Sequence, residues 1–137
     1  MSKSISLLAA CELANASGTG CAWCGKALPK RRRTWCSDKC GDAFWTNHWW
    51  SLARRAAKRR DKYRCKRCGH VPPKRNTPEW RKTRKTARLE VNHITPAAGK
   101  HGTLSCVHHL KNLETLCVAC HRLETSAQAR ARFRPCR

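Results

Sequence analysis

Two short segments of alternating apolar and polar residues flank a polar loop in the second half of the chain. The first, residues 89–94, runs into Thr-Pro and predicts a strand that ends in a loop, because proline cannot donate a hydrogen bond to a ladder. The second, residues 112–121, leads into residues 124–132, which are rich in helix formers and free of glycine and proline. The pattern predicts strand, loop, strand and helix, with His93 ending the first strand and His121 opening the helix.

A second periodic stretch, residues 37–60, predicts one long helix capped by Ser37. An apolar stripe recurs along it at helical spacing: Trp45, Trp49, Leu52 and Ala56. Tryptophan can stack on unpaired bases, but at this spacing, in a chain with 2 phenylalanines, we expect the stripe to be core. Cations crowd the end of the stretch, where they suit a helix C-terminus and present a basic edge. Three further side chains have no assigned face: Phe44, His48 and Trp50.

Residues 71–88 are rich in proline, lysine and arginine and have no periodic apolar face. We expect an exposed insertion that lies along a nucleic-acid backbone and is anchored by Trp80; a plain mobile loop fits the composition equally well. The polar segment 97–111 carries three histidines that we interpret as polar surface in preference to ligands: His101, His108 and His109.

Charge indicates the class of partner. The chain has 30 Lys and Arg against 8 Asp and Glu, a formal net charge of +22 spread along most of its length. Such an excess repels itself, and a polyanion that neutralises it explains it best. We therefore predict nucleic acid as the partner. The sequence has no lipidation signal and no apolar stretch of membrane length, and we predict neither a membrane nor a small-molecule substrate.

The chain has 137 residues and 11 cysteines, which fits a small protein that needs disulfides or metals because it buries little apolar surface. A secreted disulfide framework is one interpretation. However, the first residues make a poor signal peptide, since their apolar run covers only residues 7–10. We therefore expect a cytoplasmic, intracellular protein in which Cys-x-x-Cys pairs bind zinc.

Most of the cysteines form closely spaced pairs. The two pairs within residues 21–40 predict a closed tetrahedral site, which stabilises a fold and leaves no open position for chemistry. The pairs at 65–68 and 117–120 are both tight turns, and joining them would clamp the loop between strand and helix. The predicted ligands of these two structural zinc ions are Cys21, Cys24, Cys36, Cys40, Cys65, Cys68, Cys117 and Cys120. Three cysteines have no obvious partner and are interpreted as packing or unpaired thiols: Cys11, Cys106 and Cys136.

Phosphodiester hydrolysis needs a base that activates water, a hard cation beside it, and a loop that holds the two in register. Residues 90–94, 112–113 and 116–121, in that order, resemble the HNH endonucleases, and the resemblance covers about residues 63–132. It implies a ββα-metal fold with a structural zinc beside the catalytic centre. It also implies a general base, a loop residue that hydrogen-bonds to the backbone, and two ligands of Mg²⁺ or Mn²⁺. The resemblance makes His93 the general base and Asn112 the loop residue. It makes Asn92 and His121 the metal ligands.

One position departs from that family. The HNH pattern usually has an aspartate before the catalytic histidine, and this chain has Asn92. An amide oxygen still binds Mg²⁺ or Mn²⁺ but brings no charge, so metal affinity should fall.

The sequence thus predicts a small zinc-stabilised α+β protein, in which a four-cysteine zinc module resembling a treble clef and a long basic helix precede an HNH core. The expected boundaries are a flexible segment 1–20, the module and its helix at 21–62, and the nuclease domain at 63–137. Ten cations are expected to contact DNA: Arg31, Arg32, Arg33, Arg54, Arg55, Lys74, Arg75, Arg81, Lys82 and Arg84. Two functions fit: a metal-dependent endonuclease acting on double-stranded DNA, and a non-catalytic zinc-containing nucleic-acid-binding protein.

Overall fold

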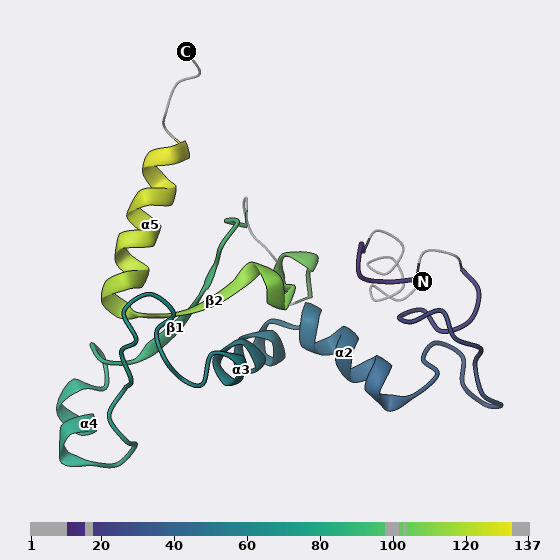
Figure 1. Ribbon diagram of the computed structural model, residues 1–137, viewed down its shortest axis with the longest axis horizontal. Coiled ribbons are helices and arrows are strands. Elements are labelled where there is room, and N and C mark those ends of the chain that lie inside the picture. Colours follow the sequence, from purple (N-terminus) through teal and green to yellow (C-terminus); the bar gives the residue numbers. More distant parts are fainter. Residues whose placement is uncertain (1–10, 16–17, 98–101, 103, 133–137) are drawn as a thin grey trace. The chain divides into compact units, whose positions relative to one another are not determined.

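The computed structural model describes residues 11–15, 18–97, 102 and 104–132 (Figure 1). Contacts divide the chain into a first unit, Met1–Ala53 with Gly99–His109, and a second unit, Arg54–Ala98 with Leu110–Arg137. The elements follow in the order α2 (Asp38–His48), α3 (Trp50–Arg60), α4 (Pro78–Thr83), β1 (Leu89–His93), the 3-10 helices η1 (Cys106–His108) and η2 (Leu110–Asn112), β2 (Leu113–Cys117) and α5 (Val118–Arg132). The predicted small α+β class is confirmed. Within the described residues, no helix has the length and apolar character that a bilayer span requires.

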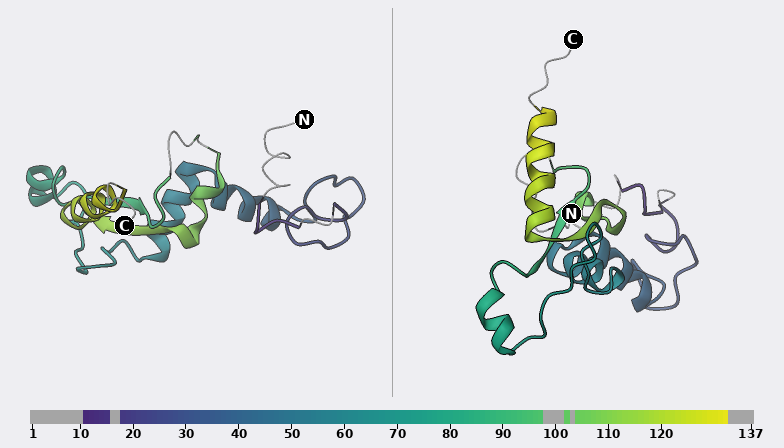
Figure 2. Two further views of the ribbon diagram at one scale, coloured as in Figure 1. Left: turned by 90° about the horizontal axis from the view of Figure 1, so that it is seen from above. Right: turned by 60° about the vertical axis from the view of Figure 1, so that its left-hand side comes forward.

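The sheet of the second unit has two antiparallel strands. β1 pairs with β2 so that Leu89 lies opposite Cys117 and His93 lies opposite Leu113. Leu89 and Leu116 are buried together with Cys65 and Cys117. Figure 2 shows α5 leading directly off the end of β2. The observed order of strand, loop, strand and helix is therefore the predicted one.

The helix of this motif begins one turn earlier than predicted. α5 starts at Val118, immediately after β2, so His121 lies inside its first turn and does not open it. The sequence predicted that His121 opens the helix, because the clearest helix formers begin at Glu124.

Polar contacts of Arg60 and Asp61 fix the end of α3 to β2 and to η2. Arg60 binds the Asp61 carboxylate through two nitrogens, at 2.9 and 3.0 Å, and also donates to the carbonyls of Leu110 and Leu113, each at 2.6 Å. Asp61 in turn accepts the backbone N–H of Thr115 in the middle of β2 at 3.0 Å. The sequence predicted only a basic edge at the end of α3. Arg60 instead makes contacts within the fold there.

The predicted single helix over residues 37–60 is wrong, because two helices occupy this stretch. Trp49 leaves the helical region with φ −89° and ψ 115°, and it forms an isolated antiparallel bridge with Leu104. Because of this break, the buried residues do not follow the single stripe that the sequence predicted. Phe44 and His48 before it, and Ala53 and Ala57 after it, are buried.

The break also overturns the predicted apolar stripe. Trp49 was expected in the core but is 38 % exposed. Phe44, which had no assigned face, is instead the centre of the aromatic packing of the first unit: its ring stacks on His48 with centroids 4.4 Å apart and meets Trp45 edge-on at 5.0 Å. Ser37 precedes α2 as predicted, but its side chain makes no capping hydrogen bond.

The segment 71–88 contains one regular element that its composition did not predict. The short helix α4 begins at Pro78, and the hydroxyl oxygen of Thr77 caps it by accepting the N–H of Trp80 at 3.1 Å. In Figure 2, α4 lies on a loop that projects from the rest of the second unit. Its cations are exposed, and Trp80 is half-buried.

Asp61 gives the fold a defined pH dependence. Burial alone would raise the pKa of Asp61, but hydrogen bonds from Arg60 and Thr115 outweigh burial and hold this pKa below the usual 3.8. A lowered folded-state pKa means that the contribution to stability is complete above the unfolded pKa and is lost as pH falls through the folded one.

We expect Asp61→Asn to lower the free energy of unfolding by about 2 kcal/mol at neutral pH, because charge-assisted hydrogen bonds are lost. The gap between variant and wild type should narrow as pH falls below about 4. Urea denaturation followed by circular dichroism measures both values. Asp42→Asn, at an exposed position of α2, is the matched control, and equal stability of all three proteins at neutral pH would contradict the role of Asp61.

Candidate active site and zinc centres

Each unit contains a cluster of four thiols. Within each cluster the ligand atoms all lie within 4.8 Å of one another, and the members are Cys21, Cys24, Cys36 and Cys40 in the first unit and Cys65, Cys68, Cys117 and Cys120 in the second. Three of the sulfur–sulfur distances are 3.5, 3.6 and 3.7 Å. Tetrahedral zinc with Zn–S bonds of about 2.3 Å places sulfurs about 3.8 Å apart. Both clusters therefore have the geometry to hold zinc, and they join the pairs that the sequence predicted to share a site.

The backbone prepares these thiols for ionisation. Burial opposes ionisation of Cys65, but backbone N–H groups of Cys68 and Cys117 aim at its sulfur and lower its pKa to about 6. Gly69, at φ +73°, closes the turn by donating to the Cys65 carbonyl at 2.9 Å. The neighbouring sulfurs of Cys117 and Cys68 raise the pKa of Cys120 to about 12. Ionising all four thiols together therefore requires a cation among them.

The thiol cluster of the second unit joins three parts of the motif. Cys117 ends β2 and Cys120 lies in the first turn of α5, while the turn that carries Cys65 is tied to β2 by the N–H of Lys66, which donates to the Thr115 carbonyl at 2.8 Å. A metal held here would fix the end of the strand and the start of the helix. It would therefore also set the position of His121, the next residue of α5.

His121 is oriented by a carboxylate that the sequence analysis did not single out. Its Nδ1 lies 2.6 Å from Oε2 of Glu90 on β1. Because a carboxylate accepts the proton on Nδ1, the Nε2 lone pair of the neutral ring is left available to a cation. Burial alone would raise the pKa of Glu90, but hydrogen bonds from His121 and Arg88 outweigh it and lower that pKa. The signal was present: Glu90 precedes Asn92 by two residues and so shares its face of the strand.

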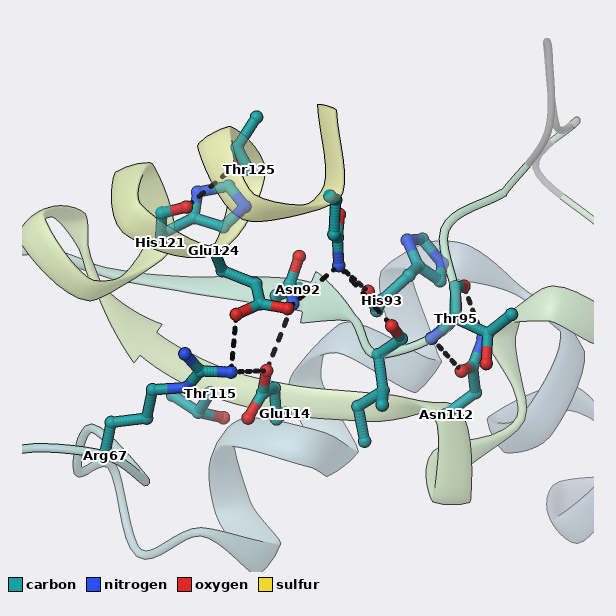
Figure 3. Close-up of polar contacts among 12 residues, drawn as sticks. Arg67, Asn92, His93, Thr95, Asn112, Glu114, Thr115, His121, Glu124 and Thr125 are labelled. Atoms are coloured by element: carbon teal, nitrogen blue, oxygen red, sulfur yellow. Dashed lines mark hydrogen bonds and ion pairs between the residues drawn. The ribbon is translucent and has the colours of Figure 1, made fainter. Parts of the chain in front are cut away.

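Hydrogen bonds fix the backbone of His93 and of the two residues that follow it. The Gln128 amide of α5 donates to the carbonyls of His93, at 3.1 Å, and Ile94, at 3.4 Å. Asn112 closes the loop that follows: its Oδ1 accepts the Thr95 N–H at 2.8 Å and its Nδ2 donates to the Thr95 carbonyl at 3.2 Å (Figure 3). Its own carbonyl accepts the Ile94 N–H at 2.9 Å. The half-buried His93 ring therefore projects from a short segment held from two sides.

Asn92 lies in a network of charged side chains (Figure 3). Its Nδ2 donates to Oε1 of Glu114, directly opposite on β2, at 3.1 Å. Arg67 lies 3.5 Å from the same carboxylate and 2.6 Å from Oε2 of Glu124, one turn beyond His121 on α5. Asn92 is 5 % exposed, so its amide is held in this orientation by packing as well as by the hydrogen bond. Two carboxylates thus stand close to the position where the HNH pattern usually has an aspartate.

The predicted catalytic residues lie on three elements: Asn92 and His93 on β1, Asn112 at the end of η2, and His121 near the start of α5. In the part of the chain that the structure describes, His93 and His121 belong to no cluster of three or more metal-ligating His, Cys, Asp or Glu side chains. The ten cations predicted to contact DNA are all exposed. One of them, Arg32, binds Asp38 at 2.9 Å.

Residues 65–127 match the family model described as HNH endonuclease. The chain contains an HNH endonuclease domain. The resemblance predicted from the sequence is thereby confirmed, and the matched range includes the Cys65 turn, both strands and the first part of α5. Comparison with curated proteins and with solved structures finds no significant match.

Cys68 offers a direct test of metal binding by the HNH domain. Its side chain is exposed, so Cys68→Ser should remove a thiolate ligand with little loss of packing. We expect the variant to carry one zinc ion fewer per chain than wild type and to lose circular-dichroism signal at lower temperature, because metal binding is coupled to folding. Elemental analysis of the purified chain gives the count.

Ser51→Ala, at an exposed position of α3, controls for handling and should leave the zinc count unchanged. Full zinc content in the Cys68→Ser protein would show that this cluster does not bind the metal.

Proposed function

We propose that the protein is a metal-dependent endonuclease that hydrolyses phosphodiester bonds of double-stranded DNA, with His93 as the general base. The observation that carries the proposal is the hydrogen-bonded closure of Asn112 on Thr95 within the HNH domain. It holds the segment after His93 in one conformation, and a base acts efficiently only when it is held within reach of the water that it deprotonates.

The side chains of His121 and Asn92 suit a hard cation of the Mg²⁺ or Mn²⁺ type. His121 has its Nδ1 bound to Glu90, which leaves Nε2 as a ligand atom, and Asn92 brings an amide oxygen. Two protein ligands are enough for Mg²⁺, which keeps several waters and takes phosphate oxygens as further ligands. A cation bound there would neutralise charge that develops on the phosphate and the leaving oxygen. His93 would take the proton of the attacking water.

The exposed cations supply the DNA affinity in this proposal. Seven of the ten belong to the second unit, which contains most of the HNH domain: Arg54, Arg55, Lys74, Arg75, Arg81, Lys82 and Arg84. Contacts of lysine and arginine with phosphates position a protein on DNA without reading sequence. We therefore propose binding of low sequence selectivity.

One observation favours the second candidate, a non-catalytic nucleic-acid-binding protein. The Glu114 and Glu124 carboxylates beside Asn92 are both paired with Arg67, so the charge that a catalytic cation needs is already partly neutralised. Incubation of the purified protein with supercoiled plasmid and Mg²⁺ or Mn²⁺ separates the two functions. Nicked or linear product supports the nuclease, and binding without product supports the alternative.

His93→Ala should slow plasmid cleavage by at least about 100-fold, because proton transfer by a positioned base contributes that much or more. Gel-shift affinity for the plasmid and the zinc content should not change, since the ring of His93 belongs to none of the clusters of metal-ligating side chains among the described residues. His70→Ala is the matched control: this histidine of the second unit bonds the Ala87 carbonyl and should be dispensable for cutting. Equal loss of activity in both variants would mean that His93 is not the base.

Asn92→Asp should make the protein more dependent on divalent cations. The new carboxylate would face Glu114 at the distance now spanned by an amide hydrogen bond, and like charges in a partly buried pair are unfavourable without a cation. The variant should therefore unfold more readily in a chelator that leaves zinc bound. Mg²⁺ should restore its stability and reach half-maximal cleavage at a lower concentration than in wild type.

The double variant Asn92→Asp, Glu114→Gln separates the two effects. It should regain stability without Mg²⁺ because the repulsion is gone, while keeping the leftward shift of the Mg²⁺ titration. A titration curve that does not move in either variant would show that residue 92 does not touch the cation.

A further inference from the structure

A third cluster of metal-ligating side chains lies in the first unit and shares no member with the four-thiol cluster there. It consists of Cys11, His48, Cys106 and His109, whose ligand atoms all lie within 4.8 Å of one another. They come from three separate segments: the N-terminal segment, the end of α2, and the turns around η1. Cys11 is 5 %, His48 0 % and His109 3 % exposed.

The distances in this cluster match a tetrahedral metal. Cys11 Sγ lies 3.2 Å from His48 Nε2 and 3.5 Å from His109 Nε2, and the two Nε2 atoms are 3.0 Å apart. Zinc with two thiolates and two imidazoles places sulfur and nitrogen about 3.6 Å apart and the two nitrogens about 3.3 Å apart. The atoms are thus packed as a bound ion would hold them.

The outer nitrogens of the two rings have partners that fix which nitrogen faces the cluster. His48 Nδ1 lies 2.7 Å from the Phe44 carbonyl, which can only accept, so Nδ1 carries the proton. His109 Nδ1 lies 3.5 Å from a carboxylate oxygen of Glu12, which favours the same tautomer. Both neutral rings then point an Nε2 lone pair into one buried space. A cation between them satisfies both lone pairs, and backing of a ligand histidine by a carbonyl or carboxylate is the usual arrangement at zinc.

We propose that Cys11, His48, Cys106 and His109 form a third structural zinc site, with two thiolate and two imidazole ligands. Four protein ligands leave no open position, so the site holds structure and does no chemistry. It accounts for the cysteines left without partners by their spacing, since each cysteine that the structure describes now falls in one of the three clusters. The turn of η1 brings Cys106 and His109 together, and Ser105 caps this turn by accepting the Val107 N–H at 3.3 Å.

The consequence concerns the connection between the two strands of the HNH domain. Residues 104–109 lie between β1 and β2 in the chain but belong to the first unit. They are held there by the Ser105 N–H, which donates to the His48 carbonyl at 3.0 Å, and by the bridge of Leu104 with Trp49. Zinc at this site would tie the strand connection to α2 and to the N-terminal segment. The proposal stands whether or not the protein cuts DNA.

Zinc content and X-ray absorption of the full-length protein test the proposal. We expect three zinc ions per chain, and zinc-edge spectra that contain imidazole scattering in a ratio of two nitrogens to ten sulfurs. The spectra are recorded on the His121→Ala protein, so that the candidate active site cannot supply the imidazole signal. Two zinc ions with sulfur-only scattering would overturn the proposal, as would a Cys11–Cys106 disulfide found by mass spectrometry of protein isolated under reducing conditions.

Adjacent histidines provide matched variants. Added to the His121→Ala protein, His109→Gln removes a proposed ligand and should lower the count from three zinc ions to two and abolish the imidazole scattering. His108→Gln, also at a buried histidine, keeps a donor for the Gly102 carbonyl that His108 Nε2 contacts at 3.0 Å, and should retain three. An unchanged count in His109→Gln overturns the site. If that variant does not fold, the spectrum of the protein with the cluster intact still decides.

Discussion

The sheet that carries His93 has only two strands of five residues each, and a two-stranded sheet is marginal on its own in water. Three features of the second unit stabilise this small sheet. α5 packs on both strands, the Asp61 carboxylate holds the middle of β2 through Thr115, and the thiols of Cys65 and Cys117 close the far end. The strand that carries His93 is therefore held by polar groups and thiols as much as by apolar burial.

The few acidic residues also take part in specific contacts. The chain has 8 Asp and Glu, and most of them are engaged by specific partners: Glu12 by His109, Asp38 by Arg32, Asp61 by Arg60, Glu90 by Arg88 and His121, and Glu114 and Glu124 by Arg67. Three of these acids lie on β1, β2 and α5 around Asn92 and His121. The few negative charges are thus used inside structural and candidate catalytic contacts, which leaves the exposed surface strongly cationic and suited to a polyanion.

Local patterns in the sequence predicted the parts of this protein that are locally determined. The alternation in residues 89–94 predicted β1. Closely spaced cysteines predicted the two-thiol turns from which the four-thiol clusters are built, because a tight turn alone brings two such thiols together. The break at Trp49 was not predictable in this way, since it coincides with pairing to Leu104, more than fifty residues away along the chain. The cluster of Cys11, His48 and Cys106 was not predicted either, because these residues are far apart in the sequence. Only the spacing of Cys106 and His109 gave a local signal, and a histidine on a polar loop is usually surface.

Asn112 holds together the two ends of the connection between β1 and β2. The connection between β1 and β2 leaves the second unit after Ala98 and returns at Leu110, so the end of β1 is followed by a segment that belongs to the first unit. The two hydrogen bonds between Asn112 and Thr95, and the third from the Ile94 N–H, close the base of the connection beside the candidate base His93. Each bond contributes about 1 kcal/mol, and together they restrain the residues that adjoin β1. The residues beyond the closure belong to the first unit, while the backbone at His93 is in register with Leu113. A side chain that both donates and accepts is needed at this point, because it must pair with the N–H and the carbonyl of one residue, and an asparagine meets that need with a short, stiff side chain.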